Sequence, residues 1–334
     1  MSLRVGIIGA GQAGERHTIG FAATPDAAVV GIADVVEARA TDLAERFGTK
    51  SYTDWRRLLD DGLDILVVSL PHNLHVAPAE AAAASGVHVL MEKPIATTLA
   101  DGERIVAACQ AGGVKLTISF VHRFRDELQA ARRWIKEGRI GQAQVACEVM
   151  NSQGGSHLPG WVRQKEAAGG GVLMYGAVHG VDRLCWLLSS EVSSVTAQTR
   201  YSTADAEVED SVVALLTFAS GATATLTANA PSYWAQPAHW ETQIYGSTGL
   251  VRLRTRHWAE LSNDQISTRL ETHTAASRLG EHYNFIRQAE EFVAAVREDR
   301  EPWITGQDGL HALEVCLAIY RSAETGQMVQ LANK

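Results

Sequence analysis

The feature that most constrains the fold is an apolar segment near the start of the chain that runs directly into closely spaced glycines. Arg4–Ile8 has the length and composition of a buried strand, and Gly9, Gly11 and Gly14 follow it in a G-x-G-x-x-G pattern. In such a turn the first glycine permits a tight bend, the second lets a pyrophosphate approach the backbone, and the third lets a helix pack closely on the strand. The helix N-terminus offers N–H groups and a positive dipole end. The turn therefore predicts a dinucleotide site, although a purely structural glycine turn is the alternative.

An acidic residue at the end of the second predicted strand indicates which dinucleotide binds. Asp34 follows the predicted strand Ala28–Ala33 and lies twenty residues after Gly14. A carboxylate at this position accepts hydrogen bonds from the adenosine ribose hydroxyls. It would repel a 2′-phosphate, and Val35 and Val36 supply no cation. We therefore expect NAD rather than NADP; the alternative is a solvated aspartate at a strand end.

Strands and helices alternate along the first third of the chain. This order predicts βαβ units and a Rossmann-type, doubly wound parallel sheet with helices on both faces. The expected strands are Arg4–Ile8, Ala28–Ala33, Ile65–Ser69, His88–Glu92 and Lys115–Ser119. The expected helices are Glu15–Ala23, Glu37–Phe47, Trp55–Asp60, Ala77–Ala84 and Leu99–Ala111.

The remaining sequence is rich in strands that no helices separate, which predicts an α+β domain with a large, mostly antiparallel sheet. The expected strands are Ala143–Asn151, Val192–Tyr201, Ser211–Ala219, Ala222–Ala230, Thr242–Tyr245, Leu250–Arg254 and His257–Leu261. The expected helices are Asp126–Glu137, Val172–Leu188, Glu281–Glu298 and Gly309–Thr325. The length of 334 residues suits about two domains. We expect an NAD(P)-binding domain at 1–123 and a substrate-binding and oligomerisation domain at 124–334, with the option that the last helices pack back on the first domain.

Composition excludes several classes of function. A net charge of −8 gives no basic surface for nucleic acid. The four cysteines show no Cys-x-x-Cys pair and no short Cys/His spacing, so we expect neither a metal site nor a disulfide framework. No apolar run reaches membrane-spanning length, and the chain enters a strand without a signal peptide. We expect a cytoplasmic enzyme that does not bind membranes.

Several motifs along the chain belong to one known pattern. They are the glycine turn, LPHNLH at Leu70–His75, HVLMEKP at His88–Pro94, FVHRF at Phe120–Phe124 and GGGVLMYGAVHGVD at Gly169–Asp182. Weaker matches are VEDS at Val208–Ser211, YGSTG at Tyr245–Gly249 and SAETG at Ser322–Gly326. With these motifs, nearly the whole chain resembles the glucose-fructose oxidoreductase, inositol dehydrogenase and MocA (Gfo/Idh/MocA) family of nicotinamide-dependent sugar and polyol dehydrogenases.

The resemblance implies roles for two residues. Lys93 would reach both the substrate oxygen and the nicotinamide ribose, and His179 would be the general acid/base. Histidine titrates near neutral pH, which suits proton transfer from a hydroxyl, and a lysine ammonium can stabilise a developing alkoxide. The resemblance also suggests a cis Lys93–Pro94 bond. The alternatives are a solubilising lysine and a core histidine.

One position departs from the family pattern. Four residues before the histidine the family commonly carries Asp, where this chain has Tyr175. A neutral phenol cannot favour an imidazolium as a carboxylate would. Tyr175 would contact the substrate, take part in proton transfer or only pack, and we favour substrate contact. Asp182, on the same helix face as His179, would contact substrate, orient a neighbour or pair on the helix surface.

Further candidate site residues follow from the motifs and the resemblance. Besides the three glycines, the cofactor candidates are Ala10, Gln12, Ala13, Asp34, Ser69, Leu70, Pro71, His72, His75, Glu92, Lys93 and Arg123. The substrate candidates are Arg163, Trp161, Asn151, His157, Tyr233 and Trp234. Because Lys93 and His179 belong to different predicted domains, we expect the active site in the cleft between them.

The leading interpretation is an oxidoreductase that acts on a secondary alcohol of a sugar, polyol or sugar-derived acid. The alternatives are a glycosidase that retains NAD and a regulator that senses dinucleotide without chemistry. Runs such as Val212–Leu216 and Ala222–Leu226 place small or apolar residues on both faces of the second sheet. Because a broad exposed apolar face is a liability, we expect a homodimer or homotetramer that packs through this sheet.

Overall fold

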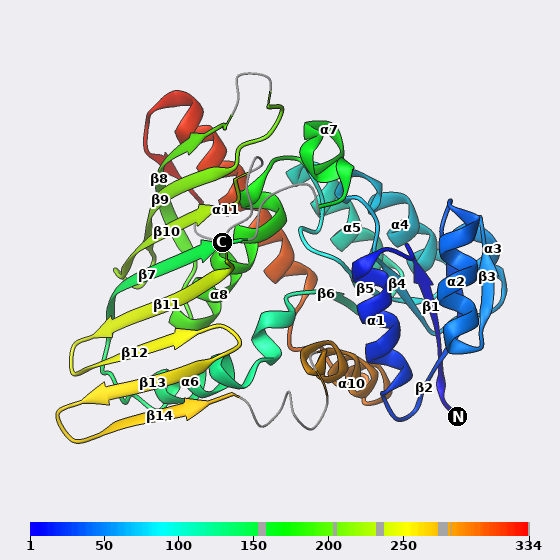
Figure 1. The fold of residues 1–334 in the computed structure, drawn as a ribbon, viewed down its shortest axis with the longest axis horizontal. Coiled ribbons are helices and arrows are strands. Elements are labelled where there is room, and N and C mark those ends of the chain that lie inside the picture. Colours follow the sequence, from blue (N-terminus) through cyan, green and yellow to red (C-terminus); the bar gives the residue numbers. More distant parts are fainter. Residues whose placement is uncertain (153–157, 203–205, 232–236, 273–279, 281, 333–334) are drawn as a thin grey trace. The chain divides into compact units, whose positions relative to one another are not determined.

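The computed structural model describes residues 1–152, 158–202, 206–231, 237–272, 280 and 282–332. The chain divides into two compact units, coloured by sequence in Figure 1. Unit 1 comprises Met1–Val121 and Leu279–Leu310, and unit 2 comprises His122–Arg278 and His311–Lys334. Among the described residues, no helix is long and apolar enough to cross a membrane.

Unit 1 contains a parallel six-stranded sheet in the order β3-β2-β1-β4-β5-β6. Its strands are β1 (Leu3–Ile8), β2 (Ala27–Ala33), β3 (Lys50–Tyr52), β4 (Ile65–Val68), β5 (His88–Met91) and β6 (Leu116–Ile118). Its helices are α1 (Gln12–Ala22), α2 (Glu37–Phe47), α3 (Trp55–Asp60), α4 (Val76–Ala84), α5 (Leu99–Ala111) and α10 (Tyr283–Arg297). The predicted doubly wound sheet is confirmed, and each predicted strand end lies within one residue of the observed end. The short strand β3 was not predicted.

Helices cover both faces of this sheet. On one face α1, α2 and α10 close an apolar core that includes Phe21, Leu43 and Phe292. On the other face, Leu58 of α3 packs close to two glycines of the sheet. An added Cβ would lie 3.1 Å from Leu58 at Gly6 and 2.5 Å from Leu58 at Gly31. Both faces of the central strands are therefore buried, which explains their nearly continuous apolar sequences.

Unit 2 contains a nine-stranded sheet in the order β14-β13-β12-β11-β7-β10-β9-β8-β15. Its strands are β7 (Ala143–Asn151), β8 (Val192–Arg200), β9 (Ser211–Phe218), β10 (Thr223–Asn229), β11 (His239–Gly246), β12 (Gly249–Arg254), β13 (Trp258–Asn263), β14 (Ser267–Glu271) and β15 (Val329–Gln330). The predicted, mostly antiparallel sheet is confirmed. Its one parallel pair joins β7 to β10 near the centre.

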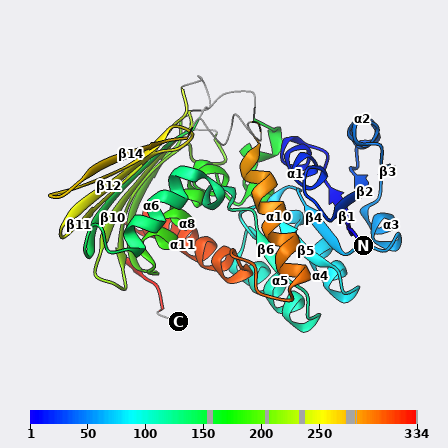
Figure 2. The same cartoon turned by 90° about the horizontal axis from the view of Figure 1, so that it is seen from below.

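Helices cover one face of the large sheet, and no described helix packs on the other. Figure 2 shows α6 (Asp126–Lys136) and α8 (Val178–Leu188) against the covered face. Gly180 lets α8 approach closely, since a Cβ there would lie 2.7 Å from the sulfur of Met150. Residues in β9 alternate between buried and accessible, and Val213 and Leu215 are more than half exposed on the opposite face.

Shorter elements complete the fold. They are the 3-10 helices η1 (His72–Leu74), η2 (Val121–Phe124) and η3 (Gly160–Arg163), the helix α7 (Lys165–Ala168) and the π-helical segment η4 (Leu173–Ala177). The long helix α11 (Gly306–Thr325) begins in unit 1 and ends in unit 2.

Candidate active site

The glycine turn between β1 and α1 has the geometry that its sequence predicts. Gly9 has a φ of 91°, in the region that favours glycine. A Cβ added to Gly9 would lie 2.1 Å from the carbonyl oxygen of Ser69. A Cβ added to Gly14 would lie 1.7 Å from the carbonyl oxygen of Gly9. At Gly11, by contrast, an added Cβ would meet no atom within 4 Å. The first and third glycines therefore permit close packing, and the second opens onto free space.

The polar groups around this turn suit a dinucleotide. Gly11 caps α1 without any side chain, so the first-turn N–H groups face outward with a positive dipole end. Asp34 Oδ2 accepts a hydrogen bond from the Ala10 N–H at 2.8 Å, and Oδ1 accepts one from the Val36 N–H at 2.8 Å. The buried Oγ of Ser69 has no hydrogen-bond partner among the described residues. These residues fit a pyrophosphate over Gly11 and a ribose beside Asp34.

Lys93 lies two residues beyond β5, on a partly buried loop. The Lys93–Pro94 peptide is cis, as the resemblance suggested. Burial lowers the pKa of Lys93, the neighbouring Glu92 carboxylate opposes this effect, and the Arg16 charge adds to it. A lysine in this setting is an ammonium donor beside the strand ends where open α/β sheets bind their ligands.

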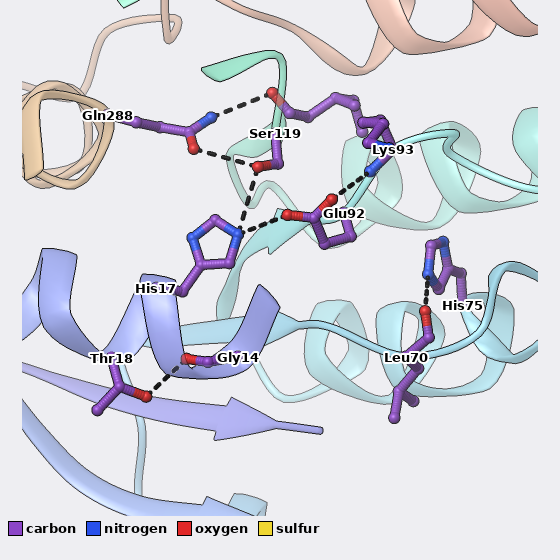
Figure 3. Close-up of polar contacts among 10 residues, drawn as sticks. Gly14, His17, Thr18, Leu70, His75, Glu92, Lys93, Ser119 and Gln288 are labelled. Carbon is purple, nitrogen blue, oxygen red and sulfur yellow. Dashed lines mark hydrogen bonds and ion pairs between the residues drawn. The ribbon is translucent and has the colours of Figure 1, made fainter. Parts of the chain in front are cut away.

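A buried polar network holds the loop that carries Lys93 (Figure 3). His17 Nε2 of α1 lies 2.8 Å from Glu92 Oε1, and Glu92 Oε2 accepts the Lys93 N–H at 3.2 Å. Ser119 Oγ lies 3.3 Å from both His17 Nε2 and Gln288 Oε1. Burial would raise the pKa of Glu92, but the His17 hydrogen bond and the His17 and Lys93 charges lower it to about 2. Both carboxylate oxygens of Glu92 are thus engaged within the fold, although the sequence suggested a cofactor contact.

The two histidines of the LPHNLH segment, which the sequence predicted as cofactor contacts, are buried. The His75 side chain is fully buried, with Nδ1 3.1 Å from the carbonyl oxygen of Ile95 and Nε2 3.0 Å from that of Leu70. Each ring nitrogen thus lies close to a backbone carbonyl, one in the loop after β4 and one in the loop after Lys93, and this position favours a structural role for His75. His72 is 3% exposed and begins η1 after Pro71.

In unit 2, His179 packs face to face against a second histidine. His179 lies in the first turn of α8, and its ring stacks on His122 with centroids 4.1 Å apart and an interplanar angle of 20°. Arg183, one turn further along α8, places Nη2 3.0 Å from His122 Nδ1. Burial, with the charges of His179, Arg183, Arg125 and Arg256, lowers the pKa of His122 well below its usual value. The predicted acid/base thus has a neutral aromatic neighbour.

Arg123 and Asp182 form a buried ion pair in unit 2. Arg123 Nη2 lies 2.5 Å from Asp182 Oδ1, and Nε lies 3.1 and 3.2 Å from the two carboxylate oxygens. Their side chains are 7% and 2% exposed. Of the readings open for Asp182, this geometry supports orienting a neighbour, because the carboxylate fixes the Arg123 guanidinium.

Tyr175 lies on a π-helical turn, so the predicted single helix Val172–Leu188 is corrected. Residues Leu173–Ala177 form η4, and α8 begins only at Val178. A π turn holds more residues than an α turn and often marks a functional site. The spacing of four residues therefore does not place Tyr175 and His179 on one helix face, as it would in a regular α-helix. The buried Glu209 anchors this segment by accepting hydrogen bonds from the Gly171 and Leu173 N–H groups at 2.8 and 2.9 Å.

Comparison with known proteins identifies the family. Residues 3–120 match the oxidoreductase family model with an NAD-binding Rossmann fold, and residues 128–252 match the GFO/IDH/MocA C-terminal domain. The chain belongs to the Gfo/Idh/MocA oxidoreductase family. It is therefore an NAD-binding oxidoreductase, as the motifs predicted.

Several relatives within the Gfo/Idh/MocA family align along nearly the whole chain. The chain is 29% identical to the 1,5-anhydro-D-fructose reductase of Ensifer adhaerens over 339 aligned residues, covering 98% of each protein. It is 28% identical to the inositol 2-dehydrogenase of Rhizobium meliloti (strain 1021), covering 99% of this chain and 100% of the relative. Among solved structures, levoglucosan dehydrogenase in complex with NADH and L-sorbose has a TM-score of 0.90 at 25% identity, with complete coverage of both chains.

Three of the remaining substrate candidates lie on described elements of unit 2. Trp161 and Arg163 share η3, where Trp161 is partly buried and Arg163 is exposed, and Asn151 ends β7. His157, Tyr233 and Trp234 fall outside the described residues. Over the described ranges, no group of three or more His, Cys, Asp or Glu side chains is arranged to hold a metal ion.

Two networks in this Gfo/Idh/MocA protein were not predicted from its sequence. In unit 1, His17 and Gln288 lie on α1 and α10, Ser119 follows β6 directly, and no motif connects them. In unit 2, one signal was available: Glu148 occupies an inward-facing position of β7, where alternation calls for an apolar residue. A buried carboxylate needs a cationic partner, and that partner is Arg183.

Proposed function

We propose that this protein transfers hydride between NAD and a secondary alcohol or ketone of a sugar, polyol or sugar-derived acid. The observation that carries the proposal is Lys93 on the loop after β5 of an NAD-binding Rossmann unit whose glycine turn opens onto free space at Gly11. The named relatives support the substrate class, since they act on an anhydro sugar and a cyclic polyol. They favour a dehydrogenase or reductase over a redox glycosidase or a regulator.

The cofactor would be held by backbone groups of Gly11, Gln12 and Ala13 at the start of α1 and by Asp34 at the ribose. The Asp34 carboxylate also accepts a hydrogen bond from the Ala10 N–H and so holds the glycine turn. A change at Asp34 would therefore affect both ribose binding and the conformation of the turn. Like-charge repulsion from Asp34 would disfavour a 2′-phosphate. When bound, the nicotinamide accepts a hydride from the substrate carbon or returns one to it.

The catalytic groups of the chain would act on the oxygen of that carbon. The Lys93 ammonium donates to the oxygen and stabilises the negative charge that develops as its proton leaves. The His179 imidazole accepts that hydroxyl proton during oxidation and returns it during reduction. Removal of the proton from oxygen and of hydride from carbon converts the alcohol to a ketone, with no further reactant.

The proposal is tested by incubating the purified protein with NAD and a panel of sugars, polyols and sugar acids while absorbance records NADH. We expect NADH to accumulate with at least one member of the panel, and NADP to be reduced more slowly. A retaining redox glycosidase would release sugar without net NADH, and a regulator would bind NADH without turnover of any panel member. Either outcome would contradict the proposal.

We also propose that the protein forms a homodimer or homotetramer through the uncovered face of the nine-stranded sheet. Val145, Val213, Leu215 and Tyr245 on this face are between 43% and 55% exposed. They belong to β7, β9 and β11, which lie in the centre of the sheet with β10. An apolar face of this kind is stabilised by burial against a second copy.

A further inference from the structure

The stacked histidines of unit 2 are the end of a buried chain of hydrogen bonds. Arg183 is fully buried and donates from Nη1 to Glu148 Oε1 and Thr242 Oγ1, and from Nη2 to Thr255 Oγ1, each at 3.0 Å. The Thr242 hydroxyl donates to Glu148 Oε2 at 2.6 Å. The guanidinium is therefore fixed by strands β7 and β11 and by Thr255, and one of its remaining N–H groups reaches His122 Nδ1 at 3.0 Å.

This contact determines the tautomer of His122. An arginine side chain carries only donors and stays protonated in proteins, so His122 Nδ1 must accept with its lone pair. The ring proton then lies on Nε2. A second proton on Nδ1 would break the bond and place an imidazolium against a buried guanidinium.

The charged groups around His122 oppose its protonation from several elements. Arg183 and His179 act from α8, Arg125 from the segment before α6, and Arg256 from the turn between β12 and β13. The opposing carboxylate, Glu148 on β7, is bound by Arg183 and not by His122. Burial raises the pKa of Glu148 to about 7, although Arg183 and Thr242 act to lower it.

We propose that His122 is a positioning residue for proton transfer: held by Arg183 as a neutral Nε2–H imidazole, it fixes the ring plane of His179 and confines the single proton of the stacked pair to His179. A neutral aromatic face stacks favourably on an imidazolium, so His122 supports His179 in both protonation states. This inference rests on the proposed role of His179 as acid/base.

The tautomer is tested on the protein without substrate, by nitrogen NMR of histidine rings labelled with ¹⁵N. The His122 and His179 signals are assigned from spectra of His122→Asn and His179→Asn. We expect His122 to keep the neutral Nε2–H pattern between about pH 5.5 and 8.5, while His179 takes up a proton in that range. A His122 ring that titrates there, or that shows the Nδ1–H pattern, would overturn the proposal.

Two substitutions of His122 test the stacked ring and the hydrogen bond to Arg183 separately. His122→Asn retains an acceptor for Arg183 but removes the stacked ring, and His122→Phe retains a flat ring but removes the acceptor. We expect kcat to fall about tenfold to a hundredfold in His122→Asn with KM little changed, and less in His122→Phe. The matched control is His311→Asn, on α11, whose Nε2 accepts a long contact of 3.4 Å from the Val192 N–H.

The outcomes distinguish this inference from the proposed function. If folded His122→Asn kept kcat within twofold of the wild type, the positioning role would be wrong. A role in stability alone would lower the unfolding midpoint of both His122 variants without a selective loss of kcat. If His179→Asn instead kept full activity, the acid/base assignment would fail, whereas the NMR result for His122 would stand.

Discussion

The imidazole of His17 lies 2.8 Å from the carboxylate of Glu92, one residue before Lys93. The two side chains are 2% and 14% exposed, so their interaction is poorly screened by solvent. The contact joins α1, which we propose receives the pyrophosphate, to the loop that carries the proposed catalytic lysine. It therefore makes the geometry of that loop dependent on α1.

The lowered pKa of Glu92 should make the stability of the fold depend on pH in the acid range. Because its pKa is lowered from 4.5 to about 2 in the folded state, Glu92 contributes stability above about pH 4.5 that is lost as pH falls toward 2. The difference corresponds to about 3 kcal/mol. In His17→Gln, burial of Glu92 is no longer compensated, so urea unfolding should show a deficit that is largest near pH 6 and shrinks toward pH 3.

The control for this experiment is Glu15→Gln, which removes an exposed pair with Arg46 in the same unit. Exposed pairs contribute little, so its pH dependence should parallel that of the wild type. If the stability curve of His17→Gln also ran parallel to the wild-type curve between pH 3 and 6, the Glu92 carboxylate would not depend on His17.

Substitution of Lys93 should affect chemistry more than cofactor binding. Removal of the ammonium in Lys93→Ala removes the group that stabilises charge on the substrate oxygen, so kcat should fall by at least about a hundredfold. The fluorescence titration of NADH should change far less. Lys50→Ala, at a 68% exposed lysine of the same unit, should retain activity. A folded Lys93→Ala protein with wild-type kcat would refute the catalytic role.

Asp34 should determine both the affinity for NAD and the discrimination against NADP. Asp34→Ser removes the charged acceptor at the ribose and the partner of the Ala10 N–H, so the Kd for NADH should rise about tenfold or more. The Kd for NADPH should rise less or fall, because the repulsion is gone. Asp42→Asn, exposed on α2, is the control. Unchanged Kd values for both nucleotides in Asp34→Ser would contradict the assignment.

The sequence predicted the strands that bury apolar residues on one or both faces, and it missed short edge strands that bury few. The strands of unit 1 that carry continuous Val, Ile and Leu were predicted to within one residue, because burial on two faces requires such runs. The edge strands Lys50–Tyr52 and Ser267–Glu271 are mostly exposed, so neither apolar alternation nor a continuous apolar run marks them. Their pairing is determined by backbone hydrogen bonds with a neighbouring strand.

The site was predictable where a short motif determines the local backbone structure, and it was less predictable where residues distant in sequence come together. The glycine turn and the Lys93 loop are local, and their structures follow from short stretches of sequence. The stack of His122 on His179 joins residues 57 positions apart, and the π turn at Tyr175 arises inside a segment that reads as a regular helix. Such features depend on tertiary packing, which one sequence does not encode locally.

Tyr175→Phe separates the three roles left open at this position. If the phenol contacts substrate, the variant should raise KM or lower kcat/KM about tenfold, the value of one hydrogen bond to a ligand. If it takes part in proton transfer, kcat itself should fall and its pH profile should change. Wild-type kinetics would leave only packing. Tyr201→Phe, at a half-exposed tyrosine, is the control and should match the wild type.

The uncovered sheet face should hold copies of the protein together. The double variant Val213→Lys with Leu215→Lys places two charges at positions that are 55% and 51% exposed in the single chain. The fold should persist because both lysines can reach solvent, but an apolar interface would have to bury their unpaired charges. Light scattering at micromolar concentration should give a dimer or tetramer of the 36.0 kDa chain for the wild type and a smaller mass for the double variant. Gln110→Lys, on exposed α5 surface, should leave the mass unchanged. A wild-type mass of one chain would refute assembly through this face.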